Sequence, residues 1–264
     1  MTSTSETISA GRSAWDFSRD LAVTLLLWGY FTLGFIMVFS PFYLAACLIP
    51  SRRELAFQGL NHMFYRGFFV LVQILIPGHR FRIAPEVRGL KSCVVVCNHV
   101  SYLDPLVMIS LFRRHKTIVK STFFKTPIFG WVIRASGYLP SVSQGGLSAL
   151  MVRQMTGMED YLSRGGVLFV FPEGTRNRKA GIAGLNPGAF KIARMCRVPI
   201  RVLAIRNTDK LFTPGRFLFN TRLENTIHVD LAGTIDPDYT RETVASKDLM
   251  DTARTMMETG GMEQ

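Results

Sequence analysis

The stretch Ser92–Cys97 (SCVVVC) leads directly into Asn98–Pro105 (NHVSYLDP). A short apolar run that is rich in valine predicts a strand buried on both faces, as in a parallel sheet. The polar residues then follow the carboxyl end of that strand, which is where ligands bind in open α/β sheets. His99 and Asp104 are therefore candidates for general-base catalysis, because an imidazole can take a proton from a hydroxyl while a carboxylate fixes its tautomer.

The same residues also have a structural interpretation. Asp104 followed by Pro105 is typical of a helix start, with a capping carboxylate and a proline in the first turn. One carboxylate can cap a helix and orient an imidazole, so both roles are compatible. Cys97 and Ser101, on either side of His99, raise a nucleophile alternative. Ser101 lacks the glycines of a nucleophile elbow, and Cys97 is expected to face the core.

A second stretch combines a strand with a basic turn. Val167–Phe171 is an apolar run, and it opens into Pro172–Lys179 (PEGTRNRK). Gly174 allows a close approach of the backbone to a ligand, and Arg176 can hold a phosphate in a bidentate contact. This pattern predicts an anion-binding turn at a second strand end. The alternative is a solvated basic turn, which is what most runs of charge become.

The rest of the chain alternates between strand and helix patterns. Alternation of this kind predicts an α/β fold with a largely parallel central sheet flanked by helices. Further strands are expected at Phe81–Ala84, Lys116–Val119, Ile200–Ile205 and Ile227–Leu231, and helices at Leu147–Leu162 and from Ser246 to near Gly260.

The composition of the chain indicates which kinds of molecule it could bind. The 264 residues include 31 Lys and Arg but only 19 Asp and Glu, which gives a formal net charge of +12. This charge favours anionic partners such as phospholipid headgroups, phosphorylated substrates or nucleic acid. Nucleic acid is disfavoured because no recognition motif accompanies the charge. The four cysteines form no CxxC pair and no zinc spacing, so we expect reduced thiols and no metal site.

An N-terminal segment points to a membrane. Leu21–Ser51 holds no charged residue and no histidine, and 20 helical residues at about 1.5 Å each cross the hydrocarbon core of a bilayer. Pro41 should break or kink this helix, so a single spanning helix and a hairpin within one leaflet both remain open. Arg52 and Arg53 follow at once and predict that the downstream domain lies on the cytoplasmic side, at the inner membrane if the source is bacterial.

Three parts of the chain are expected on these grounds. Residues 1–20 form a polar N-terminus, residues 21–77 a membrane-anchoring helical segment, and residues 78–264 the α/β domain. Within the anchor, Met63–Ile76 (MFYRGFFVLVQILI) is too short to span a bilayer, and it is either an interfacial helix or a helix that covers the sheet.

The two polar stretches together resemble signatures of the lysophospholipid acyltransferase family, the 1-acylglycerol-3-phosphate acyltransferases and their relatives. The first signature is HX4D, an Asn–His pair with Asp after four intervening residues, and it matches Asn98, His99 and Asp104. Another is the string FPEGTR at Phe171–Arg176. The resemblance covers roughly residues 80–235. It implies transfer of a fatty acyl group from a thioester donor, acyl-CoA or acyl carrier protein, to a lysophospholipid hydroxyl, such as that of 1-acylglycerol-3-phosphate, in phospholipid biosynthesis.

The resemblance also implies roles for individual residues. His99 would be the general base, Asp104 would orient it, and Arg176 would contact the acceptor phosphate. Pro199 falls in a signature linked to binding of the acyl donor. No metal or cofactor is implied beyond the acyl donor as co-substrate. The substrate-binding set implied in this way is Asn98, Ser101, Glu173, Gly174, Thr175, Arg176 and Pro199.

One departure from the family pattern concerns the acceptor. An acid–arginine pair usually follows a glycine and a short apolar run, whereas this chain has Val142 and Ser143 there. That arginine contacts phosphate in the family, so two alternatives stay open: an acceptor without phosphate, such as a lyso-ornithine-type lipid, and a non-catalytic basic lipid-binding scaffold. Arg201, on a covered strand, either pairs with a protein carboxylate or reaches the acceptor pocket in place of the missing arginine.

Overall fold

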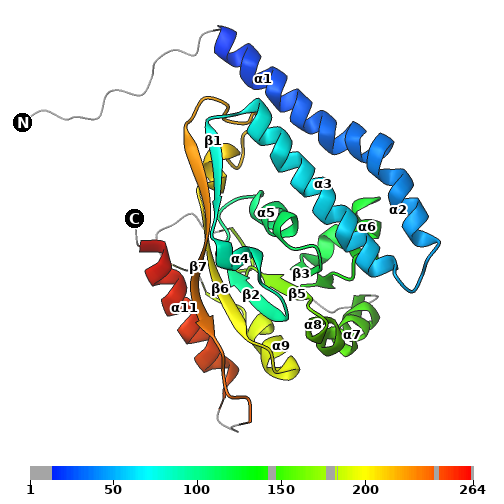
Figure 1. The fold of residues 1–264 in the computed structure, drawn as a ribbon, viewed down its shortest axis with the longest axis vertical. Helices are drawn as coiled ribbons and strands as arrows, with labels where there is room; N and C mark the ends of the chain where they lie inside the picture. Colours follow the sequence, from blue (N-terminus) through cyan, green and yellow to red (C-terminus); the bar gives the residue numbers. More distant parts are fainter. Residues whose placement is uncertain (1–13, 142–146, 177–181, 183, 241–243, 263–264) are drawn as a thin grey trace, which may run out of the picture.

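A seven-stranded sheet forms the centre of the molecule in a computed structural model, which describes residues 14–141, 147–176, 182, 184–240 and 244–262 (Figure 1). The strands lie side by side in the order β1-β7-β6-β2-β5-β3-β4. Their bounds are β1 His79–Ile83, β2 Cys93–Cys97, β3 His115–Val119, β4 Leu139–Pro140, β5 Val167–Val170, β6 Ile200–Arg206 and β7 Asn225–Ile235.

The prediction of a largely parallel sheet is confirmed. Strands β6, β2, β5, β3 and β4 pair in parallel, whereas β7 runs antiparallel to β6 and pairs in parallel with β1. Each expected strand is present, and only the two-residue β4 has no counterpart in the sequence pattern. The carboxyl ends of β2, β5 and β6 therefore meet at one edge of the sheet.

Helices cover both faces of this sheet (Figure 1). The helical elements are α1 Ala14–Gly29, the π-helical stretch η1 Tyr30–Phe39, α2 Ser40–Cys47, α3 Arg53–Leu75, α4 Pro85–Arg88, α5 Asp104–Leu111, the 3₁₀ turn η2 Ser121–Lys125, α6 Phe129–Ala135, α7 Ser148–Thr156, α8 Met158–Ser163, α9 Gly188–Cys196, α10 Thr208–Leu211 and α11 Ser246–Met262.

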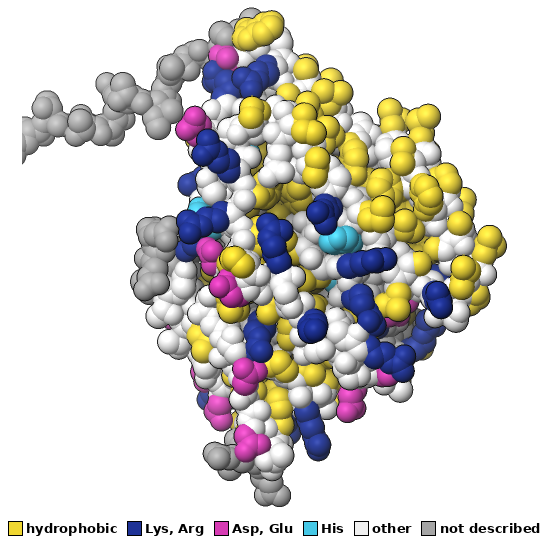
Figure 2. All heavy atoms as spheres, viewed as in Figure 1, with side chains coloured by type: hydrophobic (Ala, Val, Ile, Leu, Met, Phe, Trp, Pro, Cys, Tyr) yellow, Lys and Arg dark blue, Asp and Glu magenta, His cyan; other side chains and the backbone are white. Residues whose placement is uncertain are grey.

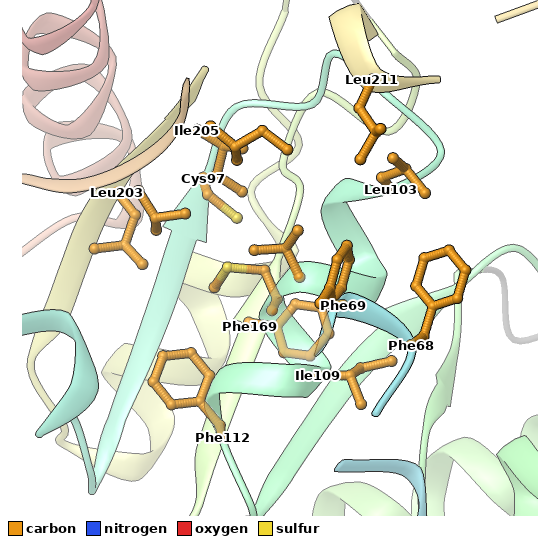
Figure 3. Close-up of a cluster of buried hydrophobic side chains, with 14 of the residues drawn as sticks. Phe68, Phe69, Cys97, Leu103, Ile109, Phe112, Phe169, Leu203, Ile205 and Leu211 are labelled. Atoms are coloured by element: carbon orange, nitrogen blue, oxygen red, sulfur yellow. The ribbon is translucent and has the colours of Figure 1, made fainter. Parts of the chain in front are cut away.

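Alternate residues of β2 enter two separate cores. Val95 and Cys97 join the cluster under α3 and α5, whose members include Phe69 and Phe169 (Figure 3). Val94 and its neighbours of the same parity pack against α8, α9 and α11 on the other face. Because both faces are buried, the strand has to be apolar at every position, which is why its sequence reads CVVVC.

The helix expected at Leu147–Leu162 is two helices rather than one. Helix α7 ends at Thr156 and α8 begins at Met158, with Gly157 between them. Glycine costs about 1 kcal/mol relative to alanine in a helix interior, so a break at this residue is inexpensive. The C-terminal helix, α11, begins at Ser246 as expected.

The N-terminal apolar segment is one continuous helical rod through α1, η1 and α2, and Pro41 does not break it. Five-residue π-helical bonding before Pro41 explains why: the Ser40 amide donates to Phe35 O. In this register Pro41, which has no N–H, would leave the Ile36 carbonyl unpaired, and the Ser40 hydroxyl donates to that carbonyl at 2.5 Å instead. The prediction of a break at Pro41 is wrong for this reason.

The rod turns back after residue 47, and α3 packs along it as the second arm of a hairpin (Figure 1). Tyr30 of the first arm stacks on Phe64 of the second, with ring centroids 5.0 Å apart, and its hydroxyl donates to Phe64 O at 2.7 Å. Phe68 and Val72 of α3 are fully buried in the core of the sheet. One face of Met63–Ile76 therefore covers the sheet, as one of the two interpretations predicts, while Met63 and Ile74 on its other face are exposed.

Polar contacts fasten both arms to the α/β domain. Near the start of the rod, the Thr24 hydroxyl accepts the Phe219 amide at 3.0 Å, and the Thr221 hydroxyl donates to Asp20 at 2.5 Å. Near the start of α3, Lys116 of β3 forms a 2.9 Å ion pair with Glu54. The hairpin is thus held in a fixed orientation against the sheet.

Candidate active site

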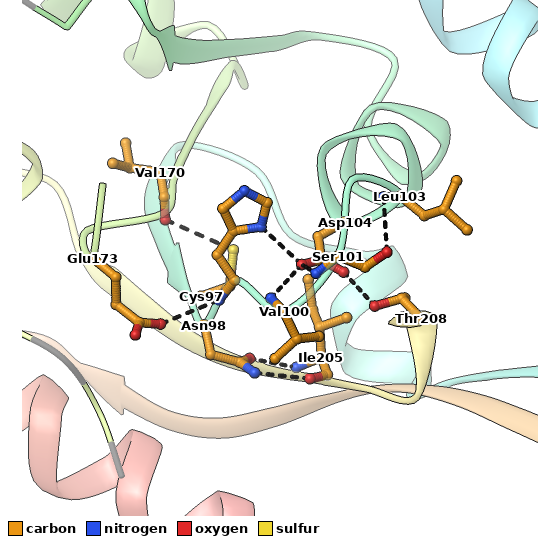
Figure 4. A network of polar contacts seen from close by, with 11 residues as sticks. Cys97, Asn98, Val100, Ser101, Leu103, Asp104, Val170, Glu173, Ile205 and Thr208 are labelled. Carbon is orange, nitrogen blue, oxygen red and sulfur yellow. Dashed lines mark hydrogen bonds and ion pairs between the residues drawn. The ribbon is translucent and has the colours of Figure 1, made fainter. Parts of the chain in front are cut away.

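A buried carboxylate organises the loop that follows β2. The Asp104 side chain is fully buried, and its Oδ2 accepts the amides of Val100 and Ser101 at 2.7 and 2.8 Å. The same oxygen lies 2.8 Å from Nδ1 of His99, while Oδ1 accepts the Thr208 hydroxyl at 2.5 Å (Figure 4). Four donors surround this buried carboxylate, and their hydrogen bonds offset the cost of removing it from solvent.

This contact fixes the tautomer of His99. A carboxylate oxygen that already accepts two amides has to receive the Nδ1 proton, which leaves the lone pair on Nε2. The ring of His99 stacks on Phe171 with centroids 4.4 Å apart and an interplanar angle of 28°. Its side chain is 16% exposed, and Nε2 has no hydrogen-bond partner among the described residues. The arrangement can therefore take a proton from a hydroxyl that approaches from outside.

Hydrogen bonds between side chains and backbone groups connect the loop after β2 to β6 and to the turn after β5. The Asn98 side chain bridges to β6 in both directions, because its Nδ2 donates to Ile205 O at 2.8 Å and its Oδ1 accepts the Ile205 amide at 2.7 Å. The His99 amide donates to Glu173 Oε1 at 3.2 Å, which joins the loop after β2 to the turn after β5 (Figure 4). Asn98 and Glu173 are thus structural ties at the strand ends.

The turn after β5 brings a cation to the same edge. Gly174 has φ +68°, which favours glycine, and its amide closes a turn onto Phe171 O at 3.1 Å. The Arg176 guanidinium carbon lies 3.4 Å from the ring centroid of Tyr102. A guanidinium stacked on a ring keeps its N–H edge available for an anion. Thr175, which lies between Gly174 and Arg176 in the sequence, is exposed.

Some predicted site residues do not join this group. Ser101 is fully buried and its hydroxyl accepts the Leu103 amide at 3.2 Å. Pro199 precedes the amino end of β6, where its carbonyl accepts the Val94 amide at 3.0 Å, so it lies at the end of the strands opposite to His99. Ser101 is therefore part of the loop scaffold, and Pro199 is remote from the histidine.

Two further expectations from the sequence can be checked in the structure. Cys97 faces the core as expected, with its thiol 3.7 Å from Val170 O, and burial raises the pKa of that thiol well above its usual range. Arg201 forms a 2.9 Å ion pair with Asp236 near the amino end of β6. It therefore pairs within the protein and does not replace the missing arginine; Val142 and Ser143 lie outside the described residues.

The sequence patterns do not predict the roles of three residues of the site. Thr208 lies 104 positions after Asp104 in the chain, and no local pattern links the two. Phe171 and Tyr102 stood inside the quoted motifs, but a single sequence does not tell which aromatic ring stacks on the imidazole and which on the guanidinium. Among the described residues, no group of three or more His, Cys, Asp or Glu side chains is arranged to hold a metal ion.

Comparisons with known proteins give a consistent result. The family model described as acyltransferase matches residues 79–206. A chloroplastic 1-acyl-sn-glycerol-3-phosphate acyltransferase of Brassica napus is 32% identical over 49% of this chain and 39% of its own length. One named for the same activity in Chlamydomonas reinhardtii is 32% identical over 77% of this chain and 56% of its own. An uncharacterized acyltransferase of Schizosaccharomyces pombe is 31% identical over 70% of this chain and 67% of its own.

A solved structure shares the fold. The crystal structure of the 1-acyl-sn-glycerophosphate (LPA) acyltransferase PlsC from Thermotoga maritima superposes with a TM-score of 0.68. The match covers 92% of this chain and 95% of the other at 21% identity, which shows likeness of fold. By contrast, the chain spans less than two thirds of the length of the Brassica and Chlamydomonas relatives.

The central carboxylate makes a testable prediction about stability. Thr208→Val keeps the volume of a fully buried side chain but removes the hydroxyl that donates to Asp104 Oδ1. A hydrogen bond to a charged group contributes about 1.5–3 kcal/mol, so the free energy of unfolding, measured by denaturant titration, should fall by that amount. The matched control is Thr255→Val, whose exposed hydroxyl bonds only to Asp251 O of its own helix; equal losses in the two variants would contradict the role given to Thr208.

Proposed function

The chain belongs to the acyltransferase family, and from this we propose that it transfers a fatty acyl group from a thioester to the hydroxyl of a lysophospholipid, with 1-acylglycerol-3-phosphate as the acceptor. The observation that carries the proposal is the 2.8 Å contact between His99 Nδ1 and Asp104, which leaves the lone pair of Nε2 available to an acceptor hydroxyl. The names of the Brassica and Chlamydomonas relatives favour this acceptor.

The first step is deprotonation of the acceptor. Nε2 of His99 takes the proton from the acceptor hydroxyl as its oxygen attacks the thioester carbonyl, so that a C–O bond forms. The positive charge that develops on the imidazole is stabilised by Asp104 through Nδ1–H. The buried carboxylate is already fully supplied with donors, and it needs no rearrangement when the charge appears.

The second step releases the thiol. The tetrahedral intermediate collapses, its C–S bond breaks, and the imidazolium returns the proton to the departing sulfur. No acyl-enzyme forms, because the nearby Ser101 and Cys97 side chains are fully buried and the latter thiol has a raised pKa. The donor is acyl-CoA or acyl carrier protein. The reaction needs no metal or redox cofactor, since a thioester is already activated.

Arg176 is proposed as the ligand of the acceptor phosphate. It follows the glycine turn at the end of β5, and its guanidinium lies over Tyr102, three residues after His99 in the chain. A phosphate held by this cation would lie at the same edge of the sheet as the imidazole, because both follow the carboxyl ends of neighbouring parallel strands. An acceptor without phosphate is the alternative, since Arg201 offers no substitute for the missing arginine.

The protein is proposed to lie at a membrane surface, with the hairpin in one leaflet. Within the described residues, one helix, Trp15–Cys47, is long and apolar enough to cross a membrane, and only 17% of its most apolar window is buried. Figure 2 shows hydrophobic side chains gathered on the hairpin side of the molecule. Exposed members include Leu33, Met37, Phe42, Leu44, Leu48, Met63, Ile74, Ile128 and Trp131. A patch this extensive is typical of a membrane contact, and the fixed packing of the hairpin on the sheet favours a peripheral over a spanning position.

The catalytic assignment predicts loss of turnover in His99→Ala. Removal of a general base costs about 10²–10⁴-fold in rate, measured as thiol release and as labelled phospholipid product. The control His228→Ala changes a histidine on β7 outside the site and should keep wild-type turnover. Near-normal turnover in folded His99→Ala, checked by its melting temperature, would refute the mechanism.

The acceptor assignment predicts a selective kinetic defect in Arg176→Gln. The KM for 1-acylglycerol-3-phosphate should rise about tenfold or more, because a charge-assisted contact is lost, while the KM for the thioester donor stays unchanged. Arg153→Gln, an exposed arginine on α7, is the control of equal charge. If the acceptor KM does not move in Arg176→Gln, the phosphate is bound elsewhere.

The membrane proposal predicts how the protein leaves the membrane fraction. Apolar contact is not screened by salt, whereas electrostatic attachment is. The full chain should therefore stay in the pellet after a 1 M salt wash (roughly a 3 Å Debye length) and leave it in mild detergent. A membrane-impermeant lysine reagent should label the domain in inside-out vesicles only, as the cytoplasmic orientation requires. Release by salt alone would contradict insertion.

A further inference from the structure

A cavity lies at the end of the strands opposite to His99, between helices that cover one face of the sheet. Its volume is about 610 Å³, within the usual range of roughly 300–1,000 Å³ for ligand pockets. It opens between α3, α4 and the connection from α5 to β3, and it reaches the amino end of β5 at Val167. His99 follows the carboxyl end of β2, which runs parallel to β5, so the two sites occupy opposite ends of the strands.

Four arginines line this cavity: Arg66 of α3, Arg88 of α4, and Arg113 and Arg114 before β3. Throughout the described ranges, no carboxylate lies within ion-pair distance of any of them. Arg114 donates through Nη1 to the carbonyl of Arg164, while its buried Nε has no partner among those residues. Arg66, Arg88 and Arg113 are exposed and Arg114 is half-buried. Four arginines around one cavity without counter-charges favour the binding of an anion there.

The positive charge around the cavity also affects the pKa of His62. It lines the cavity one turn before Arg66, and its Nδ1 lies 3.1 Å from Ile109 O. Burial lowers the pKa of His62, and the charges of Arg66 and Arg113 lower it further. The neutral imidazole then adds a hydrogen-bonding group without adding charge.

The rest of the lining is apolar. Phe69 and Phe112 line it and are more than nine-tenths buried, and Phe81 and Leu90 line it as well. From the cavity, α3 continues outward with Met63, Val70 and Ile74, which are 61%, 48% and 68% exposed. Figure 2 shows Lys and Arg side chains on this face next to the apolar surface of the hairpin.

We propose that this cavity binds an anionic phospholipid, with the lipid phosphate held by Arg66 and Arg113 and its apolar part against the phenylalanines and α3. The shared chemistry is that of a phosphate group, which a free phosphate compound also carries. The lipid is favoured because a free phosphate would leave the apolar half of the lining without a function. The proposal does not rest on acyl transfer, since none of these residues belongs to the candidate active site.

Native mass spectrometry of the full chain in mild detergent tests this proposal, with dioctanoyl phosphatidylglycerol as the probe. The Arg176→Gln background weakens any binding at the acceptor site, so a remaining lipid reports on the cavity. Arg66→Gln/Arg113→Gln should weaken that binding about tenfold or more, because two charge-assisted contacts are lost. The control Arg153→Gln/Lys247→Gln removes the same charge from exposed positions elsewhere and should bind like wild type.

The outcomes separate the possible ligands. Dioctanoyl phosphatidylcholine, which has no net charge, should bind at least about tenfold more weakly, and millimolar inorganic phosphate should fail to displace the phosphatidylglycerol. Equal binding of both lipids, or unchanged binding in the arginine double variant, would overturn the proposal. Complete displacement by inorganic phosphate would overturn the lipid assignment in favour of a free phosphate compound. Should the double variant melt early, Arg113→Gln alone, at an exposed position, gives the same comparison.

Discussion

The buried charge of Asp104 is the constraint on which the rest of the site depends. A carboxylate removed from water is costly unless it is fully supplied with donors, and here four donors from two segments of the chain meet at its two oxygens. Two of them are amides of the loop after β2, one is the hydroxyl of Thr208 after β6, and one is His99. The loop, the strand end and the imidazole are positioned together because each has to satisfy the same group.

The sheet makes this convergence possible. Strands β2, β5 and β6 are parallel neighbours, so the residues that follow them emerge at one edge although they are far apart in sequence. Asn98 and Glu173 then tie the three strand ends together. The hairpin adds a second constraint, since its packing on the sheet fixes how an exposed apolar surface is oriented relative to that edge.

Local patterns in the sequence were sufficient for much of this architecture. The apolar runs predicted all but one of the strands, and the contact between His99 and Asp104 follows from their five-residue separation. The predicted break at Pro41 does not occur, because the π-helical register and the Ser40 hydroxyl compensate for the missing N–H of the proline. Composition does not reveal this local hydrogen bonding. Thr208 and the position of Pro199 depend on which strand ends meet, and that follows from strand order. The arginine cavity is likewise assembled from segments that no motif connects.

The tautomer of His99 shows whether Asp104 holds the imidazole ready to accept a proton at Nε2. Long-range ¹H–¹⁵N NMR of the histidine side chains distinguishes a protonated from an unprotonated ring nitrogen at a pH above the titration of the imidazole. We expect that Nδ1 of His99 carries the proton and Nε2 the lone pair, and that Asp104→Asn removes this preference. A His99 ring protonated at Nε2 in the folded wild-type protein would contradict it, because no lone pair would then face the acceptor hydroxyl.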